Sequence, residues 1–189
     1  MLGNFRNLTL NYNQISFLKS TSEYCRYPMK NGKPCPAYGK NYSCPPFAPK
    51  PNEIKTLLKK YSNFEVIIYE YYLREHIKKI EKAHPNWQEG KVLNPRFYNS
   101  HIYYALRKRL NEISCNKNYF ILGNGCCWLC RSHGGCSVKY NLPCRYSNRK
   151  IKNSMEAVGI NVFKTLLNIG YKLEEHPKKI VCQVGLICN

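Results

Sequence analysis

Residues 126–136 read Cys126-Cys127-Trp128-Leu129-Cys130-Arg131-Ser132-His133-Gly134-Gly135-Cys136, and Cys144-Arg145 follows soon after. The segment from 126 to 145 is too short to hold a hydrophobic core, yet it carries five cysteines and a histidine. A second cysteine-rich segment lies upstream and contains Cys25, Cys35 and Cys44-Pro45-Pro46. The two segments hold eight of the eleven cysteines of the chain. The pattern predicts two ligand loops that bind a metal ion or a metal cluster.

Length and composition are typical of one compact domain. The chain has 189 residues, no low-complexity linker divides it, and 43% of its residues are hydrophobic, which is enough for a sizeable core. We therefore expect a single cysteine-rich, metal- or cluster-binding domain over residues 1–189.

The cysteines point to a reducing compartment. Eleven cysteines would also suit a secreted disulfide scaffold. However, the first residues lack the apolar stretch and the small-residue cleavage site of a secretion signal. The longest apolar candidate for a membrane span, residues 66–73, is short and is interrupted by Glu70. The prediction is a soluble, cytoplasmic protein with reduced thiols and no membrane contact.

The charge leaves two interpretations open. Thirty lysines and arginines oppose eleven acidic residues, a formal excess of +19. Such a surface could neutralise nucleic-acid phosphates or could simply be solvated. The basic residues are dispersed in pairs such as Lys59-Lys60 and Lys178-Lys179, and thiolates bound to a metal would reduce the excess.

The first half of the chain alternates between strand-like and helix-like patterns. Residues 5–18 predict an early strand or extended segment, whereas residues 22–51 predict an irregular loop rich in glycine, proline and cysteine. A helix is predicted after Pro51-Asn52, because apolar residues recur at helical spacing up to Tyr61. Residues 64–73 are rich in β-branched and aromatic residues and predict a strand.

The second half continues the alternation. A short helix is predicted around residues 77–82, and Ser100 is the predicted cap of a longer helix whose residues 107–109 are basic and solvated. Residues 119–122 predict a strand that leads into the downstream cysteine loop. Ser154 is expected to cap a further helix that Gly170 ends, and residues 180–187 predict a strand.

This order of elements is typical of an α/β or α+β fold. We expect a single layered domain with a mixed sheet, flanking helices and two cysteine-rich loops.

The spacing of the cysteines suits sulfur-based coordination. Cys127 and Cys130 are separated by two residues, so both thiolates can approach one ion or one cluster without straining the backbone. Iron–sulfur clusters use thiolates almost exclusively, whereas zinc accepts thiolate and imidazole alike. The thiol-rich inventory favours an iron–sulfur cluster, with zinc as the alternative.

Four separated motifs carry a resemblance to a known family. The chain resembles the DUF2284 family of predicted metal-binding proteins, and the motifs occur in the same order over most of the chain. They are Cys35-Pro-Ala-Tyr-Gly-Lys-Asn-Tyr-Ser-Cys44-Pro-Pro46, Gly125-Cys-Cys127-Trp-Leu-Cys130, Pro143-Cys144-Arg145 and Ser154-Met-Glu-Ala-Val-Gly159-Ile-Asn-Val162. The resemblance implies a cysteine-rich protein of mainly anaerobic microbes that binds metal or an iron–sulfur cluster, here expected to be of the 4Fe-4S type.

The resemblance also implies a ligand set. Where the family pattern offers a further downstream cysteine, this chain has His133, with Cys126 and Cys136 close enough to substitute. Arg145 matches the motif beside its cysteine, and we expect it to contact the bound group or a backbone carbonyl near it. The expected metal ligands are Cys25, Cys35, Cys44, Cys127, Cys130, Cys136 and Cys144.

The other thiols and His133 have simpler interpretations. Cys115 and Cys182 are expected to be small buried residues, and Cys188 a loose surface thiol near the end of the chain. Adjacent side chains diverge, so Cys127 ranks ahead of Cys126 as a ligand. His133 is either a nitrogen ligand or solvent-facing.

Three functions remain open. The leading hypothesis is an iron–sulfur protein that supports electron transfer or sulfur-related redox chemistry with a redox or sulfur-handling protein partner. The alternatives are a zinc-stabilised nucleic-acid-binding module and a cluster-dependent enzyme acting on a small molecule. The pattern identifies no catalytic residue and does not establish an enzyme.

Overall fold

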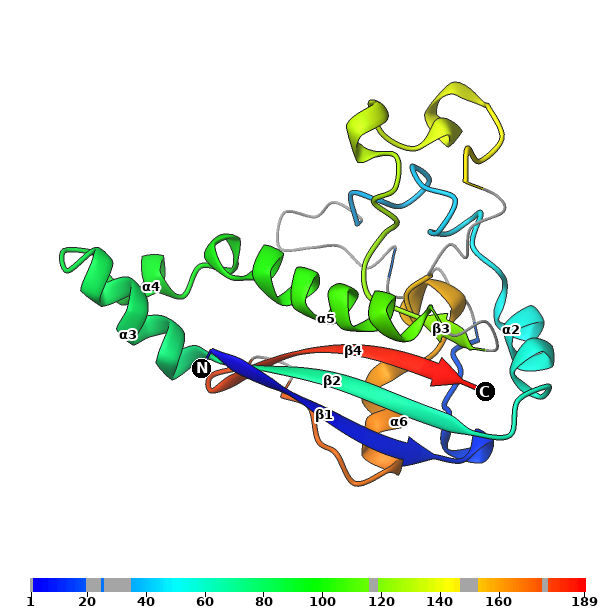
Figure 1. Ribbon diagram of the computed structural model, residues 1–189, viewed down its shortest axis with the longest axis horizontal. Helices are drawn as coiled ribbons and strands as arrows, with labels where there is room; N and C mark the ends of the chain where they lie inside the picture. The colour runs from blue at the N-terminus through cyan, green and yellow to red at the C-terminus, as the bar shows by residue number, and fades with distance from the viewer. Residues whose placement is uncertain (1, 20–24, 26–34, 116–118, 147–152, 175–176) are drawn as a thin grey trace.

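The computed structural model describes residues 2–19, 25, 35–115, 119–146, 153–174 and 177–189. Within these residues the strands β1 (Gly3–Leu10), β2 (Phe64–Tyr72), β3 (Phe120–Leu122) and β4 (Ile180–Cys188) form one sheet in the order β1-β2-β4-β3. The helices are α2 (Pro51–Leu58), α3 (Leu73–Ala83), α4 (Glu89–Val92), α5 (Asn99–Ile113) and α6 (Val162–Asn168). The α+β alternative is therefore confirmed (Figure 1).

Every strand pair in this sheet is antiparallel, so the expected mixed sheet is wrong. β2 and β3 run in the same direction, as a crossover through α5 requires. They are not neighbours, however, because β4 lies between them and runs opposite to both.

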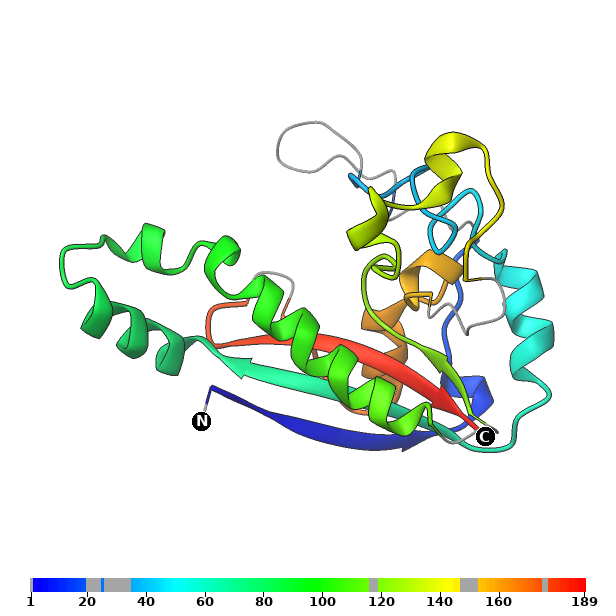
Figure 2. The ribbon, with the colours of Figure 1, turned by 45° about the horizontal axis from the view of Figure 1, so that its top comes forward.

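Both faces of the sheet are covered. Alternate residues of a strand point to opposite faces, and in β2 Val66 and Ile68 belong to one apolar cluster while Ile67 and Tyr69 belong to the other. The first cluster is completed mainly by residues of α2 and α6, and the second by Ile102, Leu106 and Leu110 of α5. This burial on both sides explains why residues 64–73 are almost continuously apolar. Figure 2 shows α5 lying along one face of the sheet.

Most predicted elements agree with the structure, with two corrections at helix ends. The cap of α5 is Tyr98 rather than Ser100, which lies inside the helix. The helix predicted between Ser154 and Gly170 is divided into a 3₁₀ turn, Glu156–Val158, and α6. Gly159 adopts φ 83° and ends the turn, and the Asn161 side chain then accepts from the Lys164 N–H to begin α6.

The extended segment predicted over residues 5–18 is shorter than expected. β1 ends at Leu10, and a 3₁₀ helix (Tyr12–Gln14) follows. The predicted upstream loop lies partly outside the described residues, and its described part, residues 35–49, consists of turns. No helix formed by the described residues is long and apolar enough to cross a membrane.

Candidate metal centre

The sheet delivers the chain into the downstream cysteine loop through a tight turn. After β3, the Gly123 N–H donates to the Asn153 carbonyl over 2.7 Å, and Gly125 adopts φ 61°. A Cβ atom at Gly125 would lie 3.1 Å from the Tyr103 ring of α5. Gly125 therefore permits both the left-handed backbone and the close approach to α5. Beyond this turn, residues 126–146 lie side by side with residues 35–50 in both views (Figures 1 and 2).

Ser43 joins the two cysteine loops. Its side chain is fully buried, and its hydroxyl accepts a 2.8 Å hydrogen bond from the backbone N–H of Cys127. The Asn153 side chain donates to the Ser43 carbonyl over 3.0 Å. A second tie runs from the Tyr42 hydroxyl to the Leu142 carbonyl over 2.7 Å. These contacts hold the upstream loop against the downstream loop although 84 and 100 residues separate the bonded pairs.

Four thiols of the downstream loop surround one small cavity. Cys127, Cys130, Cys136 and Cys144 line a space of about 10 Å³. Asn41, Tyr42 and Ser43 of the upstream loop also line this space, together with Leu129 and Tyr146. We call the four cysteines, Cys127, Cys130, Cys136 and Cys144, the downstream thiol group. A donor set of four thiols fits zinc or an iron–sulfur cluster.

Backbone turns shape the loop around this group. The N–H groups of His133 and Gly135 donate to the Cys130 carbonyl over 3.0 and 2.9 Å. Gly134 and Gly135 have φ values of 75° and 99°, a region that favours glycine. Arg145, which was expected near the bound group, is exposed and donates to the carbonyls of His133 and Gly135 over 3.2 and 3.4 Å. Arg145 thus braces the loop.

The electrostatics of Cys127 reflect opposing effects. Burial raises the pKa of its thiol, and the neighbouring thiols Cys130 and Cys136 raise this pKa further. A hydrogen bond from the Leu129 backbone and the positive charge of Arg107 lower it. A metal ion must displace the thiol proton in order to bind, so burial opposes loading and the two favourable contacts assist it.

The remaining cysteines of the two loops are Cys25, Cys35, Cys44 and Cys126, and we call them the upstream thiol group. The Cys35 N–H donates to the Cys25 carbonyl over 3.1 Å. Burial raises the pKa of Cys44 to about 12; the Ser43 hydroxyl lowers it, and the neighbouring Cys126, Cys25 and Cys35 thiols raise it further. Burial also raises the pKa of Cys25 to about 11, with Cys35 and Glu156 adding to the rise.

Arg107 is a site residue that sequence reasoning missed. It was expected on a solvated face, but its guanidinium donates to the carbonyls of Cys126 and Asn124 over 2.7 and 3.1 Å. The same guanidinium lies 4.2 Å from the centre of the Trp128 ring. Arg107 was overlooked because it stands in a run of three basic residues. Helical periodicity was the one signal in the sequence that could have distinguished the half-buried Arg107 from the exposed Lys108 and Arg109.

The other thiols and His133 lie away from the two groups. Cys188 is fully buried in the main apolar cluster, so the expectation of a surface thiol is wrong, because the chain end completes strand β4. Cys115 is exposed rather than buried, because α5 ends just before it. Cys182 is half-buried and lies 3.4 Å from the Tyr171 hydroxyl. His133 is exposed, and its Nδ1 lies 3.0 Å from the Ser132 hydroxyl.

Among the described residues, no three histidine, cysteine, aspartate or glutamate side chains are arranged to hold one metal ion. Thiolates bound to one zinc ion lie within about 4.6 Å of one another, because each Zn–S bond is about 2.3 Å long. Thiolates of a cluster bind different iron atoms and can stand further apart.

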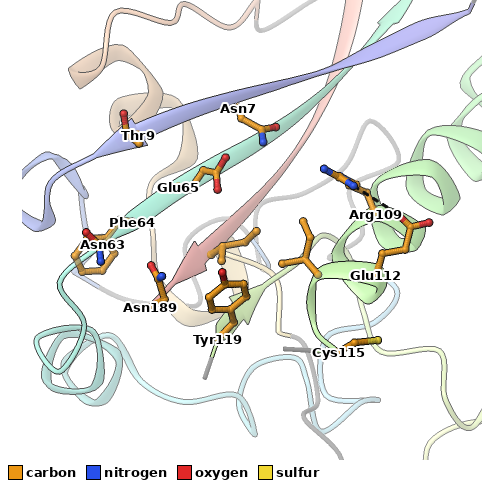
Figure 3. Close-up of a pocket in the computed structure, with 12 residues that line it drawn as sticks. Asn7, Thr9, Asn63, Phe64, Glu65, Arg109, Glu112, Cys115, Tyr119 and Asn189 are labelled. Atoms are coloured by element: carbon orange, nitrogen blue, oxygen red, sulfur yellow. Dashed lines mark ion pairs between the residues drawn. The ribbon is translucent and has the colours of Figure 1, made fainter. Parts of the chain in front are cut away.

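Two of the larger cavities lie near cysteines. One lies beside the downstream thiol group, and the other lies at the end of the sheet where β4 ends. The first has a volume of about 500 Å³ and is lined by Arg107, Asn124, Cys127 and Trp128, among others. The second, of about 720 Å³, lies where β1 and α5 end and β2 begins, and Arg109 and Glu112 form an ion pair at its wall (Figure 3). Its lining includes Cys115 but no cysteine of the two thiol groups.

Comparison with known proteins adds one finding. A family model described as a predicted metal-binding protein, DUF2284, matches residues 9–188. No curated protein and no solved structure matches the chain. Because the match spans nearly the whole chain and both thiol groups, this protein belongs to the DUF2284 family of predicted metal-binding proteins.

Proposed function

We propose that the protein binds an iron–sulfur cluster, of the 4Fe-4S type, at the downstream thiol group. The observation that carries this proposal is the shared cavity, whose lining among the described residues includes four cysteines and no histidine or carboxylate. Iron–sulfur clusters are held by thiolates, whereas zinc sites often include imidazole.

The surrounding residues would protect and tune the bound group. Tyr42 and Ser43 cover the cavity on the side of the upstream loop and exclude water there. The Leu129 N–H and the Arg107 charge favour the thiolate form of Cys127. Hydrogen bonds to sulfur and restricted solvent access are the protein's main means of setting a cluster's reduction potential.

Loading requires the cavity to expand. A space of about 10 Å³ is far smaller than a cluster, so the four thiols must move outward. The outer part of the loop can move at little cost in buried surface, because Tyr140 and Leu142 are already 57% and 51% exposed.

When bound, the cluster would supply one-electron exchange in electron transfer or sulfur-related redox chemistry. Leu129, Tyr140 and Leu142 are large exposed apolar residues beside the thiols and would seat a redox or sulfur-handling protein partner. The excess of +19 would attract an acidic partner. Such chemistry belongs in the reducing cytoplasm.

The proposal is tested by purifying the chain without oxygen and recording its visible absorption before and after addition of dithionite. We expect a coloured protein whose absorption is bleached by reduction. Cys130→Ser should lose this absorption, whereas the matched control Cys115→Ser should retain it. A colourless wild-type protein that carries only zinc would overturn the proposal, and salt-dependent binding of nucleic acid by that zinc form would support the nucleic-acid alternative.

A second candidate function, a cluster-dependent enzyme acting on a small molecule, rests on the cavity of about 500 Å³ beside Cys127. The buried Asn124 Oδ1 at its wall has no hydrogen-bond partner within the described residues, and Lys108 lies on the rim. Lys108 suits a ligand carboxylate, and the Asn124 Oδ1 suits a ligand donor such as an amide N–H. Thermal-shift screening of such compounds should find one that raises Tm in the wild type but not in Asn124→Leu, and the absence of any such compound would count against the enzyme.

A further inference from the structure

We infer that the cavity of about 500 Å³ beside the downstream thiol group binds a small carboxylic acid with an apolar body and an amide N–H, and that this ligand covers Cys127. An occupied cavity then blocks access to the Cys127 thiol and slows the release of a metal bound there. The effect on a bound metal rests on the proposed function. The contact between the ligand and Cys127 depends only on the cavity and requires no catalysis.

Cys127 belongs to two cavities at once. It lines the small space shared by the downstream thiol group, and it also lines the cavity of about 500 Å³. Leu129 is shared by the two cavities in the same way. The other thiols of the group, which the structure also describes, are not part of the larger lining. Cys127 is therefore the thiol of this group that an occupant of the larger cavity contacts.

The larger cavity has the size and the apolar surface of a small-molecule site. Such sites have volumes of about 300–1,000 Å³ and are lined mainly by apolar and aromatic side chains. Here Tyr104, Leu110, Trp128 and Leu129 supply this surface. The Trp128 ring is held in place, because the Arg107 guanidinium lies 4.2 Å from its centre. These walls suit the apolar body of a ligand.

The lining also carries an excess of positive charge. Arg107 and Lys108 both line the cavity from adjacent positions of α5. Glu112 is the carboxylate of the described lining, and it forms an ion pair with Arg109 at 3.7 Å. Two cations thus oppose one carboxylate that already has a partner. This balance favours an anionic ligand such as a carboxylate.

An unsatisfied acceptor adds a requirement for a donor. Asn124 lines the cavity and is 5% exposed. Its Nδ2 donates to the Gln183 Oε1 over 3.1 Å, whereas its Oδ1 has no hydrogen-bond partner within the described residues. Buried acceptors are usually paired. An amide N–H of the ligand would supply the missing donor.

The binding experiment uses hippurate, which combines a phenyl ring, an amide N–H and a carboxylate. The chain has two tryptophans, so Trp87→Phe leaves Trp128 in the cavity as the fluorescent reporter. Hippurate should change this fluorescence with saturation and so give a Kd. The analogue 3-benzoylpropionate has a methylene in place of the N–H, and it should bind about two- to tenfold more weakly.

Two exposed residues of α5 provide a matched pair of variants in this background. Lys108→Gln removes a cation from the lining and should raise the Kd for hippurate about two- to fivefold. Arg109→Gln removes the same charge at the next position, which is outside this lining, and should leave the Kd unchanged. An equal effect of the two variants would contradict the placement of the carboxylate.

Alkylation of the full chain tests the contact with Cys127. The protein is treated with iodoacetamide while a chelator is present throughout, and mass spectrometry of its peptides measures the labelling of each cysteine. At a hippurate concentration ten times the Kd, labelling of Cys127 should slow about tenfold, because only the empty cavity admits the reagent. Cys136 and Cys144, which do not line this cavity, and the exposed Cys115 should keep their rates.

The outcomes separate the ligand site from the proposed function. Unchanged Trp128 fluorescence up to about 10 mM hippurate would overturn the ligand site, whatever metal the protein holds. Saturable binding that slows the four downstream thiols equally, or slows none of them, would overturn the contact with Cys127. A protein that carries only zinc would overturn the iron–sulfur assignment, and selective protection of Cys127 in that protein would still support the ligand site.

Discussion

The Ser43 hydroxyl accepts a 2.8 Å hydrogen bond from the backbone N–H of Cys127, and this contact joins two cysteine loops that lie 84 residues apart in the chain. Ser43 is fully buried and Cys127 is half-buried, so removal of the bond leaves a partly sheltered N–H without its acceptor. The contact fixes the relative position of the two thiol groups. Ser43 was not among the expected site residues.

Ser43→Ala should lower the free energy of unfolding by about 1–3 kcal/mol, because the Cys127 N–H is left without its acceptor. The variant should also release metal to a chelator faster than the wild type. Urea unfolding and chelator kinetics measure the two effects. Ser114→Ala is the matched control, since its hydroxyl donates to the exposed Asn111 carbonyl at the end of α5. Equal behaviour of the two variants would show that the Ser43 contact does not hold the loops together.

Arg107→Lys should weaken the downstream loop while keeping the positive charge. One guanidinium nitrogen, Nη2, donates to both carbonyls while the guanidinium lies over the Trp128 ring, and the lysine ammonium has no planar group that could lie there in the same way. We expect a loss of stability of about 1–2 kcal/mol and faster release of metal. Arg109→Lys is the control on the same helix, because Arg109 is exposed and pairs with Glu112 at 3.7 Å. A loss in the control as large as in Arg107→Lys would refute the role of Arg107.

His133→Ala should retain its metal, because the imidazole is exposed and lies beside Ser132 rather than in the cavity of the thiols. Cys136→Ser should lose metal from the downstream group. Metal analysis of the two purified variants distinguishes them. If the histidine variant loses metal and the cysteine variant keeps it, then the fourth downstream ligand is His133.

Cys188 should make the apoprotein less stable at alkaline pH. Burial raises the pKa of its thiol from an ordinary 9.0 to about 12. The folded state therefore keeps this proton between those values while the unfolded state releases it. The contribution of this thiol to the free energy of unfolding is fully present below pH 9.0 and is lost as the pH rises towards 12. Over this range the free energy of unfolding falls by up to about 1.4 kcal/mol per pH unit.

Urea unfolding of the wild type and of Cys188→Ala across this pH range measures the effect as a difference. The alanine variant should be less stable by about 1 kcal/mol near neutral pH, because it leaves a cavity in the core. Its stability should then fall less steeply with pH. Parallel curves for the two proteins would mean that the Cys188 thiol does not titrate in this way.

The sequence predicted the elements whose patterns are local. Strand β2 was predicted because its residues are β-branched and aromatic, and α2 because Pro51 begins it and its apolar residues recur at helical spacing. The order of strands was not predictable in this way. β4 pairs with a strand more than a hundred residues upstream, and no local pattern records that it would enter between β2 and β3.

The four cysteines that line the downstream cavity, Cys127, Cys130, Cys136 and Cys144, were among the ligands expected from the sequence, and their role as ligands stays a prediction. Their arrangement was not predictable. The contacts of Ser43 and Arg107 depend on loops that meet only in the folded chain. Likewise Cys188 was taken for a surface thiol, because only the tertiary structure shows that the chain ends in a central strand.

The most direct test of the central claim is the amount of iron, acid-labile sulfide and zinc per chain in protein purified without oxygen. If thiolates of the two loops hold iron–sulfur clusters, iron and sulfide should be present in equal amounts, at about four of each for every centre. Zinc without sulfide, or no bound metal at all, would contradict the account.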